Sequence, residues 1–346
     1  MNRIFVKSVN WVGDAVLVTP ALRALRRAFP RAHITLLARP WVADVFEANP
    51  DIDRLWTAEE SKSFRRFREI AARMRREAFD LGIALPNSFG SALLMAMGRV
   101  KRRVGYRRDG RGFLLTDAVA VTPEILKVHQ VDYYLHLLRG ICDVDAQPRE
   151  LVVPAAPDAD LHVRRVLRDA GVGEDNRSEG GRPLVGLSPG ATFGSAKRWL
   201  PERFAAVADY VAQKYAAQVV IAGSKGESAV AKDVARRAKS RVVVLCGLFP
   251  LRGVIALCDH LRLLVTNDSG NMHIAAARGV PIVAIFGSTD WVTTAPYHPR
   301  AIIVRRATPC APCLLRHCPP ELEHACMESV TVEDVIEAVD KQMERA

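Results

Sequence analysis

The sequence predicts an α/β protein built from two doubly wound halves, each with a mainly parallel sheet. Short apolar runs of strand length alternate with stretches of helical periodicity, and this alternation is typical of βαβ units. Residues 171–181 are rich in Gly, Asp, Asn and Ser, and a second series of strands and helices follows them. We therefore expect a first domain over residues 1–170, a second over 182–330 and a final helix over 331–346.

The first half contains several apolar runs and one long periodic stretch. The expected strands and helix are Ile4–Val6, Ala15–Phe29, His33–Leu37 and Leu81–Leu85. Pro20 lies inside the helical stretch, where proline either bends a helix or marks its first turn. Pro30 follows the last periodic residue and is expected to end the helix.

The second half repeats the alternation with clearer start signals. The expected strands are Leu184–Leu187, Gln218–Ala222, Val242–Leu245, Leu261–Val265 and Pro281–Phe286. The expected helices are Pro201–Tyr215, Glu227–Ala238, Asn271–Ala277 and Thr331–Arg345. Pro201 suits a first helical turn, and Thr331 stands three residues before Asp334, as a capping residue does.

Composition excludes several classes of protein. The 346 residues are 49% hydrophobic and 25% charged, a balance that excludes a mostly disordered chain and a multi-span membrane protein. No window of about 18 apolar residues predicts a transmembrane helix. Asp14 interrupts the first apolar stretch, so we expect no signal peptide and a cytoplasmic protein. Lys and Arg number 49 against 38 Asp and Glu, and the net charge of +11 favours anionic partners.

Two clusters of basic residues carry part of this surplus. Lys62–Arg76 contains seven Lys and Arg residues against Glu69, and Arg99–Arg111 contains seven against Asp109. Each cluster is either a solvated surface or a binding surface for an anion such as a phosphorylated lipid. Binding of nucleic acid is a third hypothesis, since a few aromatic residues lie among the charges, but the sequence contains no recognised nucleic-acid motif.

Catalytic residues in an open α/β sheet are expected directly after strands, because ligands bind outside the carboxyl ends of the strands. The first such segment is residues 8–14, Ser-Val-Asn-Trp-Val-Gly-Asp. Asp14 is either a general base that removes a proton from an acceptor hydroxyl or the N-cap of the following helix.

The second segment, residues 188–199, contains two glycines, three hydroxyl side chains and the pair Lys197-Arg198. It is either a phosphate-binding loop or a surface loop with incidental charge. The pattern G-x-x-x-x-G-K-[ST] is absent, which argues against a nucleotide-hydrolysing site. The fingerprint G-x-G-x-x-G after a strand is absent as well, which argues against a dinucleotide-dependent dehydrogenase.

The third segment is residues 267–273, Asn-Asp-Ser-Gly-Asn-Met-His. A strand followed by small residues and a helix start turns backbone N–H groups and the helix dipole toward an anion. Gly270 permits close approach of the backbone, and His273 either faces the same ligand or is structural. Asp268 is either an N-cap or a partner for sugar hydroxyls.

Four of the seven cysteines lie close together near the end of the chain. They are Cys310, Cys313, Cys318 and Cys326, with His317 and His324 between them. This density is typical of a zinc or iron–sulfur site, but a reduced cluster that stabilises a loop, or a disulfide, fits it as well.

Together the three segments resemble the ADP-heptose:lipopolysaccharide heptosyltransferases, glycosyltransferase family 9, which have the GT-B architecture of two Rossmann-like domains facing across a cleft. The resemblance covers nearly the whole chain and rests on Trp11–Asp14, Pro189–Trp199 and Thr266–Gly270 with His273, in that order. The Trp-Val-Gly-Asp form and the late cysteines look more like the type that adds the second inner-core heptose. Because the family's chemistry is normally metal-independent, the resemblance implies no metal and no cofactor.

The resemblance also implies a role for each matching residue. Asp14 would be the catalytic base of an acceptor-binding N-terminal domain. In a C-terminal domain that binds the nucleotide sugar, Lys197 would neutralise the donor diphosphate and Asp268 would lie at the donor sugar. The other implied donor-binding residues are Thr192, Ser269, Gly270 and His273. Residues 223–227 are the expected region for adenosine.

The implied reaction is inverting transfer of L-glycero-D-manno-heptose from ADP-heptose to the first heptose of the lipopolysaccharide inner core. The implied partners are ADP-heptose, the lipid A–Kdo–heptose acceptor and the anionic inner leaflet, with peripheral association at the cytoplasmic face of the inner membrane and no nucleic acid. Two alternatives remain open: a related GT-B transferase that uses another nucleotide sugar, and a transferase with the acceptor of the first heptose.

Overall fold

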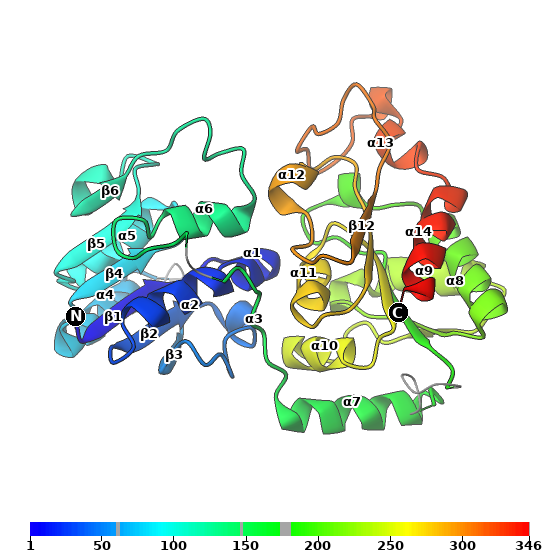
Figure 1. The fold of residues 1–346 in the computed structure, drawn as a ribbon, viewed down its shortest axis with the longest axis horizontal. Coiled ribbons are helices and arrows are strands. Elements are labelled where there is room, and N and C mark those ends of the chain that lie inside the picture. Colours follow the sequence, from blue (N-terminus) through cyan, green and yellow to red (C-terminus); the bar gives the residue numbers. More distant parts are fainter. Residues whose placement is uncertain (60–62, 146–147, 174–180, 346) are drawn as a thin grey trace. The chain divides into compact units, whose positions relative to one another are not determined.

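The computed structural model describes residues 1–59, 63–145, 148–173 and 181–345. The chain divides into two compact units, Met1–Val153 (unit 1) and Pro154–Ala346 (unit 2). Each unit has a six-stranded sheet with helices on both faces (Figure 1). The predicted α/β fold with two doubly wound halves is therefore confirmed.

Unit 1 is built around a sheet with the strand order β3-β2-β1-β4-β5-β6, in which every neighbouring pair is parallel. Its elements are β1 (Arg3–Lys7), α1 (Val12–Leu17), α2 (Thr19–Ala28), β2 (His33–Ala38), α3 (Pro40–Ala43), β3 (Arg54–Thr57), α4 (Phe64–Glu77), β4 (Leu81–Ala84), α5 (Phe89–Met97), β5 (Arg102–Tyr106), β6 (Asp117–Val119) and α6 (Gln130–His136). This is the strand order of dinucleotide-binding doubly wound sheets, and the order reverses between β1 and β4.

The first expected helix, Ala15–Phe29, is two helices in the structure. Proline cannot donate a backbone hydrogen bond, so α1 ends before it and α2 starts afresh with Pro20 in its first turn. The short α1 carries residues 12–17 away from the end of β1. The break that Pro20 predicted is thus confirmed.

One face of the unit 1 sheet is covered by α4 and α5 through an apolar cluster. At its centre are the rings of Phe5, Trp56 and Phe79, with centroids 5.3–6.3 Å apart. Arg73 of α4 places its guanidinium 3.7 Å from the centroid of the Trp56 ring. The arginine-rich helix α4 therefore stabilises the core through the cation–π contact between Arg73 and Trp56.

Unit 2 has a sheet with the order β12-β11-β10-β7-β8-β9, again parallel throughout. Its elements are α7 (Pro157–Asp169), β7 (Leu184–Ser188), α8 (Pro201–Tyr215), β8 (Gln218–Ile221), α9 (Ser228–Arg237), β9 (Val242–Val244), α10 (Leu251–Cys258), β10 (Leu263–Asn267), α11 (Gly270–Ala277), β11 (Ile282–Ile285), α12 (Trp291–Thr294), β12 (Ala301–Val304), α13 (Ala325–Glu328) and α14 (Val332–Glu344). Its strand order reverses between β7 and β10.

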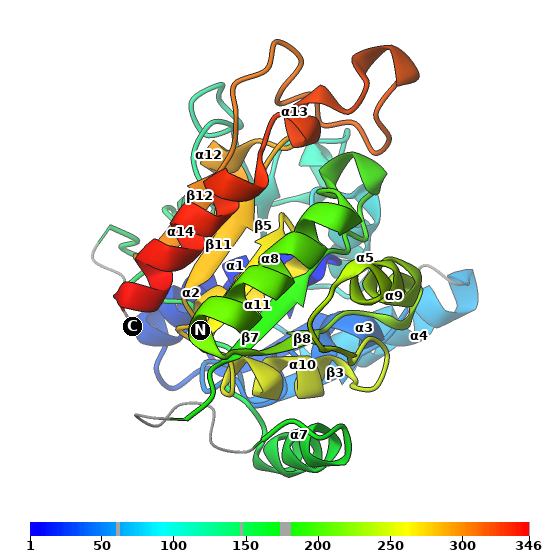
Figure 2. The ribbon, with the colours of Figure 1, turned by 90° about the vertical axis from the view of Figure 1, so that its right-hand side faces the viewer.

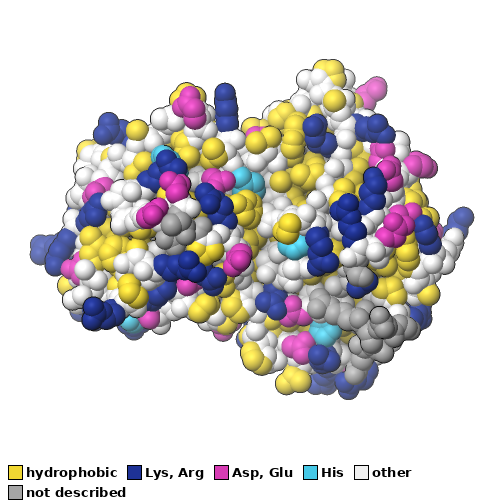
Figure 3. Space-filling view, viewed as in Figure 1, with side chains coloured by type: hydrophobic (Ala, Val, Ile, Leu, Met, Phe, Trp, Pro, Cys, Tyr) yellow, Lys and Arg dark blue, Asp and Glu magenta, His cyan; other side chains and the backbone are white. Residues whose placement is uncertain are grey.

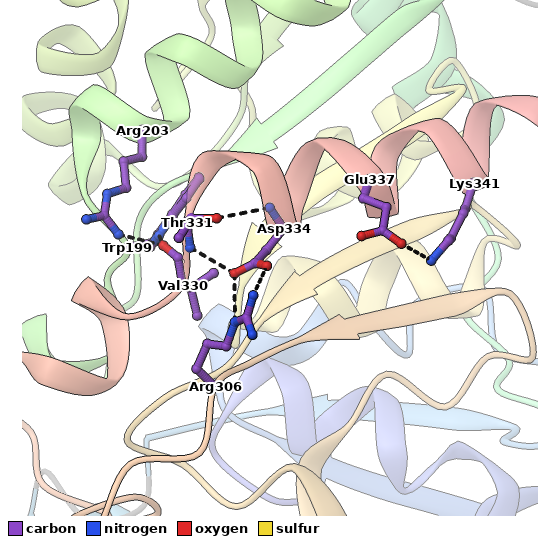
Figure 4. Close-up of polar contacts among 8 residues, drawn as sticks. All are labelled: Trp199, Arg203, Arg306, Val330, Thr331, Asp334, Glu337 and Lys341. Carbon is purple, nitrogen blue, oxygen red and sulfur yellow. Dashed lines mark hydrogen bonds and ion pairs between the residues drawn. The ribbon is translucent and has the colours of Figure 1, made fainter.

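The final helix, α14, packs beside α8 on one face of the unit 2 sheet, while α10 and α11 cover the other face (Figures 1 and 2). Thr331 and Asp334 cap its start reciprocally, and Arg306 forms an ion pair with Asp334 (Figure 4). Just before the cap, the Val330 carbonyl accepts a hydrogen bond from Nε1 of Trp199, at 2.9 Å. Helix α14, which its capping residues predicted, is therefore also hydrogen-bonded through Val330 to Trp199.

The division between the units falls after Val153, earlier than the Gly-rich segment that suggested a boundary at 170–182. Helix α7 lies between these two points and belongs to unit 2, because it packs on α10. His260 and Asp160 are hydrogen-bonded at 2.7 Å, and the rings of His162 and Phe249 meet edge to face. The composition of residues 171–181 predicts a loop. The unit to which the preceding helix, α7, belongs is set by its packing on α10.

No helix in the described part of the chain is both long enough and apolar enough to cross a bilayer.

Candidate active site

A pocket of unit 1 opens where the strand order reverses, at the carboxyl ends of β1 and β4. Its cavity has a volume of about 270 Å³. The residues that line it are Val9, Asn10, Trp11, Asp14, Leu85, Pro86, Asn87, Arg108, Leu126, Gln130, Tyr133 and Tyr134. Three amides, a carboxylate, an arginine and three aromatic rings are suited to a sugar, whose hydroxyls need hydrogen bonds and whose ring faces pack on aromatic groups.

Asp14 is the third residue of α1 and not its N-cap. The cap position is held by Trp11, and no side chain caps this helix. The N-cap hypothesis for Asp14 is therefore wrong, because α1 starts at Val12, three residues before the expected start at Ala15. The carboxylate instead lines the pocket beside Tyr134, whose pKa is raised first by burial and then by the charge of Asp14.

The pocket wall formed by residues 86–91 is held in place by Arg111, a guanidinium with no exposed surface. Its hydrogen-bond acceptors are the carbonyl oxygens of Tyr106, Pro86 and Ser88 and the side chains of Asn87 and Ser91. Burial lowers the pKa of Arg111 to about 10, so the group stays charged at neutral pH. Since Pro86 and Asn87 line the pocket, this buried cation positions its wall.

In unit 2, charged side chains meet at the corresponding place, the carboxyl ends of β7 and β10. Lys197 Nζ and Asp268 Oδ2 are 2.6 Å apart, and the two side chains are 14% and 5% exposed. Asn267 ties the same segments together, because its side chain donates to the Pro189 carbonyl and accepts from the backbone N–H of Trp199. The structure therefore brings two of the expected donor-binding residues into direct contact.

The start of α11 lies beside this ion pair. Ser269 is the cap residue of the helix, Gly270 is its first residue, and the buried His273 follows one turn later. Asp268 precedes the cap, so the N-cap hypothesis for this residue is wrong as well. Asn271 donates to Ser188 Oγ at 3.1 Å, which fixes the first turn of α11 against the end of β7. The free N–H groups and positive end of α11 thus lie next to Lys197.

Glycines in the loop after β7 make room for two neighbouring segments. A Cβ on Gly190 would lie 2.1 Å from Glu227 Oε1, so a larger residue here would displace this carboxylate. Glu227 also accepts hydrogen bonds from the backbone N–H and hydroxyl of Ser224. The expected adenosine region, residues 223–227, therefore packs directly on the loop that carries Lys197. Thr192 is exposed, and no hydrogen bond of its side chain is found within the described ranges.

The cysteine-bearing segment packs on the other side of that loop. The Arg316 carbonyl accepts the backbone N–H of Ala196 at 3.0 Å, and a Cβ on Gly194 would lie 2.1 Å from the same oxygen. His317 Nδ1 and Ser195 Oγ are 3.0 Å apart, and His324 Nε2 lies 3.1 Å from the Ala196 carbonyl. The segment therefore positions the lysine loop.

The four late cysteines are free thiols in the structure, as are the other three. The pKa of the Cys326 thiol is raised to about 11, first by burial and then by its neighbours Cys310, Cys313 and Cys318. Within the part of the chain that is described, no three His, Cys, Asp or Glu side chains are arranged to hold a metal ion.

Sequence reasoning missed the residues that position the site from a distance. Arg111 was counted within a basic cluster, and its burial could not be read from that cluster. Arg316 was not predicted to have a role, and His317 was noted only as a neighbour of the cysteines. Gly190 and Gly194 were the sequence features that could have indicated these contacts. Gly190 lies where the carboxylate of Glu227 approaches, and Gly194 lies where the backbone of Arg316 approaches.

Several basic side chains of unit 1 form ion pairs or hydrogen bonds with other parts of the same unit. Arg102 pairs with Asp117, Arg103 donates to two backbone carbonyls, and Arg75 donates to the Met97 carbonyl. On the face drawn in Figure 3, Lys and Arg side chains are interspersed with Asp and Glu. Part of each cluster is therefore structural, and Arg108 lines the pocket.

Two parallel doubly wound sheets, each with polar side chains at its point of strand reversal, define an α/β protein of the GT-B glycosyltransferase type. The crystal structure of Escherichia coli ADP-heptose lipopolysaccharide heptosyltransferase II matches all of this chain at a TM-score of 0.83 and 25% identity, with 99% of that chain covered. A family 9 glycosyltransferase from Veillonella parvula matches at a TM-score of 0.87 and 25% identity, covering 100% and 98% of the two chains.

The chain belongs to glycosyltransferase family 9 (heptosyltransferase), which residues 67–324 match. Lipooligosaccharide heptosyltransferase 2 of Campylobacter jejuni is 28% identical over 343 residues, which are 98% of each chain. Lipopolysaccharide heptosyltransferase 2 of Escherichia coli is 27% identical over 88% of each chain. The resemblance found in the sequence is confirmed, and the protein is a glycosyltransferase.

Proposed function

We propose that this glycosyltransferase moves L-glycero-D-manno-heptose from ADP-heptose to the first heptose of the lipopolysaccharide inner core. The similarity to heptosyltransferases 2 over almost the entire chain supports this substrate pair. The observation that carries the proposal is the ion pair of Lys197 and Asp268 beside the start of α11, since it combines a cation for a diphosphate with a carboxylate for a sugar.

The donor is assigned to unit 2. Its diphosphate would take up the positive end of α11 and the ammonium of Lys197, which would exchange part of its contact with Asp268 for phosphate oxygens. Asp268 would then accept hydrogen bonds from heptose hydroxyls. Ser269 and Gly270 would offer backbone N–H groups, His273 would support the turn from within α11, and Thr192 would act from the exposed part of the loop.

The acceptor is assigned to the pocket of unit 1, where Asp14 is the proposed base. The carboxylate would remove the proton from the acceptor hydroxyl as its oxygen attacks the anomeric carbon of the donor. That carbon would lose its bond to the phosphate oxygen, and ADP would leave with the electron pair. One direct displacement inverts the anomeric centre and needs no metal and no cofactor. A positioned base contributes about 10²–10⁴-fold to such a step.

A donor panel tests the substrate assignment. The purified protein is incubated with ADP-heptose, UDP-sugars and GDP-sugars, using acceptors that carry one heptose or none. We expect transfer from ADP-heptose alone and to the one-heptose acceptor alone. Transfer only from UDP- or GDP-sugars would establish the alternative donor, and transfer to the heptose-free acceptor would establish the alternative acceptor.

Asp14→Asn tests the proposed base. The variant keeps the shape of the side chain but cannot take a proton, so kcat should fall about 10²–10⁴-fold while the affinity for ADP is retained. Asp145→Asn is the matched control, because this exposed carboxylate of unit 1 lies outside the pocket and pairs with Arg139. Turnover close to that of the control would show that Asp14 is not the base.

The lipid-linked acceptor also implies a location. We propose a cytoplasmic protein that associates peripherally with the anionic inner leaflet of the inner membrane, in keeping with the net charge of +11. Fractionation of cells with and without a salt wash tests this, because a peripheral protein is released by salt and remains otherwise with the membrane.

A further inference from the structure

The exposed apolar side chains of unit 1 are concentrated around the Asp14 pocket. In its described residues, the large apolar side chains with high exposure are Met1, Trp11, Trp41, Phe64, Phe89, Phe113 and Leu126. Five of these lie at or beside the pocket, and we call them the aromatic rim: Trp11, Trp41, Phe89, Phe113 and Leu126. Scattered exposed apolar residues are normal, whereas a cluster around a binding pocket marks an interaction surface.

Each member of the rim lines the pocket or is linked to it through a neighbouring residue. Trp11 and Leu126 line the cavity directly. Trp41 donates from Nε1 to the carbonyl of the pocket residue Asn10, at 2.9 Å. Phe89 begins α5 two residues after the pocket residue Asn87, and its ring lies 6.1 Å from that of Phe113.

Cations accompany these rings. Arg107 and Arg108 are exposed and form no ion pair within the described residues, although Asp109 beside them offsets one charge. The guanidinium of Arg39 lies 5.2 Å from the centroid of the Trp41 ring. Trp, Phe and Arg side chains together are typical of surfaces that enter the headgroup region of a bilayer, where one end of each side chain stays wet.

We propose that the aromatic rim is the surface by which unit 1 docks on a bilayer containing anionic lipid. Phe113, which is 76% exposed, and Phe89 enter the boundary between headgroups and acyl chains, while Arg107 and Arg108 pair with lipid phosphates. The pocket mouth then opens into the headgroup region, where the sugar of a lipid-linked acceptor is presented. The choice of a membrane over another protein rests on the proposed function, whose acceptor is linked to a lipid, and on the exposed Arg107 and Arg108, whose charge is complementary to anionic headgroups.

The test uses the full-length protein and vesicles without any glycolipid. Vesicles of equimolar phosphatidylethanolamine and phosphatidylglycerol are sedimented with the protein, and neutral phosphatidylcholine vesicles are the comparison. We expect binding to the anionic vesicles that weakens with salt. Phe113→Ser and Phe89→Ser should each weaken binding by up to about tenfold, since a phenylalanine loses its transfer to an apolar environment. Unchanged binding of the double variant would overturn the proposal.

Phe64→Ser is the matched control. Phe64 is 67% exposed and begins the arginine-rich α4, outside the rim. We expect this variant to bind vesicles as the wild type does. Loss of binding in Phe64→Ser with retention in Phe113→Ser would assign the membrane contact to α4 and would refute the rim. Circular dichroism checks that each variant is folded.

Two further measurements separate this inference from its alternatives. In transfer assays, Phe113→Ser should raise KM for the acceptor in vesicles but leave KM for a water-soluble, deacylated acceptor unchanged. If light scattering instead shows that Phe113→Ser converts a dimer to a monomer, the rim is an interface between copies and the proposal fails. The vesicle-binding measurement uses no donor, so its result tests the rim independently of the donor panel that tests the proposed function.

Discussion

The ion pair between Lys197 and Asp268 gives a prediction in which stability and ligand affinity change in different ways. Lys197→Met removes the cation but keeps an extended side chain. The Asp268 carboxylate, which is 5% exposed, would then lie without its partner in the protein interior. Removing one member of a buried pair costs about 3–5 kcal/mol, whereas removing both charges costs much less. Because Lys197 is 14% exposed and water can reach this side, we expect about 3 kcal/mol for the single variant.

The double variant Lys197→Met/Asp268→Asn decides whether the charge pair is the cause. It leaves no unpaired charge, so it should recover most of the stability lost in Lys197→Met, with a coupling energy of about 1–3 kcal/mol. Hydrogen exchange measured by mass spectrometry reports on β7 and β10 separately from unit 1, and peptides from unit 1 serve as the internal control. This local measurement is needed because a chain of two units does not unfold in one two-state step.

The affinity for ADP should follow a different order. Lys197→Met and the double variant both lack the ammonium and should bind ADP weakly. Asp268→Asn frees the ammonium from its carboxylate and should bind ADP at least as tightly as the wild type, while losing affinity for the sugar-bearing donor. Equal hydrogen exchange in the single and double variants, or unchanged affinity of Lys197→Met for ADP, would refute this reasoning.

Three other predictions concern positions outside the ion pair. Gly194→Ala places a Cβ against the carbonyl of Arg316, so the lysine loop must shift, and calorimetry should show weaker ADP binding than in Gly140→Ala, where a Cβ meets open space in unit 1. Arg111→Met leaves several buried carbonyl groups unpaired, and hydrogen exchange in unit 1 should show a loss of about 3 kcal/mol, whereas no loss would contradict the positioning role. The pKa of Asp80 is lowered to about 2, mainly by its hydrogen bond from Lys101. Its stabilisation is complete above the unfolded pKa of about 4 and is lost as the pH falls toward 2, so acid unfolding of Asp80→Asn should be less steep in that range.

The succession of strands and helices along the chain could be predicted because helical periodicity and apolar runs are local properties of the sequence. Pro201–Tyr215 was expected with the bounds that the structure has, since proline at the start and apolar spacing both act within a few residues. Strand β5 was missed because its sequence, Arg-Arg-Val-Gly-Tyr, looks like part of a charged loop. Its arginines are satisfied by Asp117 and by backbone carbonyls that lie distant in the sequence, which no local pattern reveals.

The site could be predicted in part for the same reason. Residues that follow strands are adjacent at one edge of a parallel sheet, so Lys197 and Asp268 were both named without knowledge of their contact. That they pair with each other could not be read from the sequence, because 71 residues separate them. Nor could the sequence place Asp14 as the third residue of α1 and not its cap.

The amino-acid sequence alone determined the succession of strands and helices, the family, and the residue types available after each strand. These depend on local propensity and on motifs whose spacing is fixed along the chain. Packing between distant segments is what makes Arg111 a buried cation behind the pocket, sets the cysteine segment against the lysine loop, and leaves the aromatic rim exposed. Each of these results from packing between segments far apart in the chain, where burial and charge pairing are set by neighbours that the local sequence does not name.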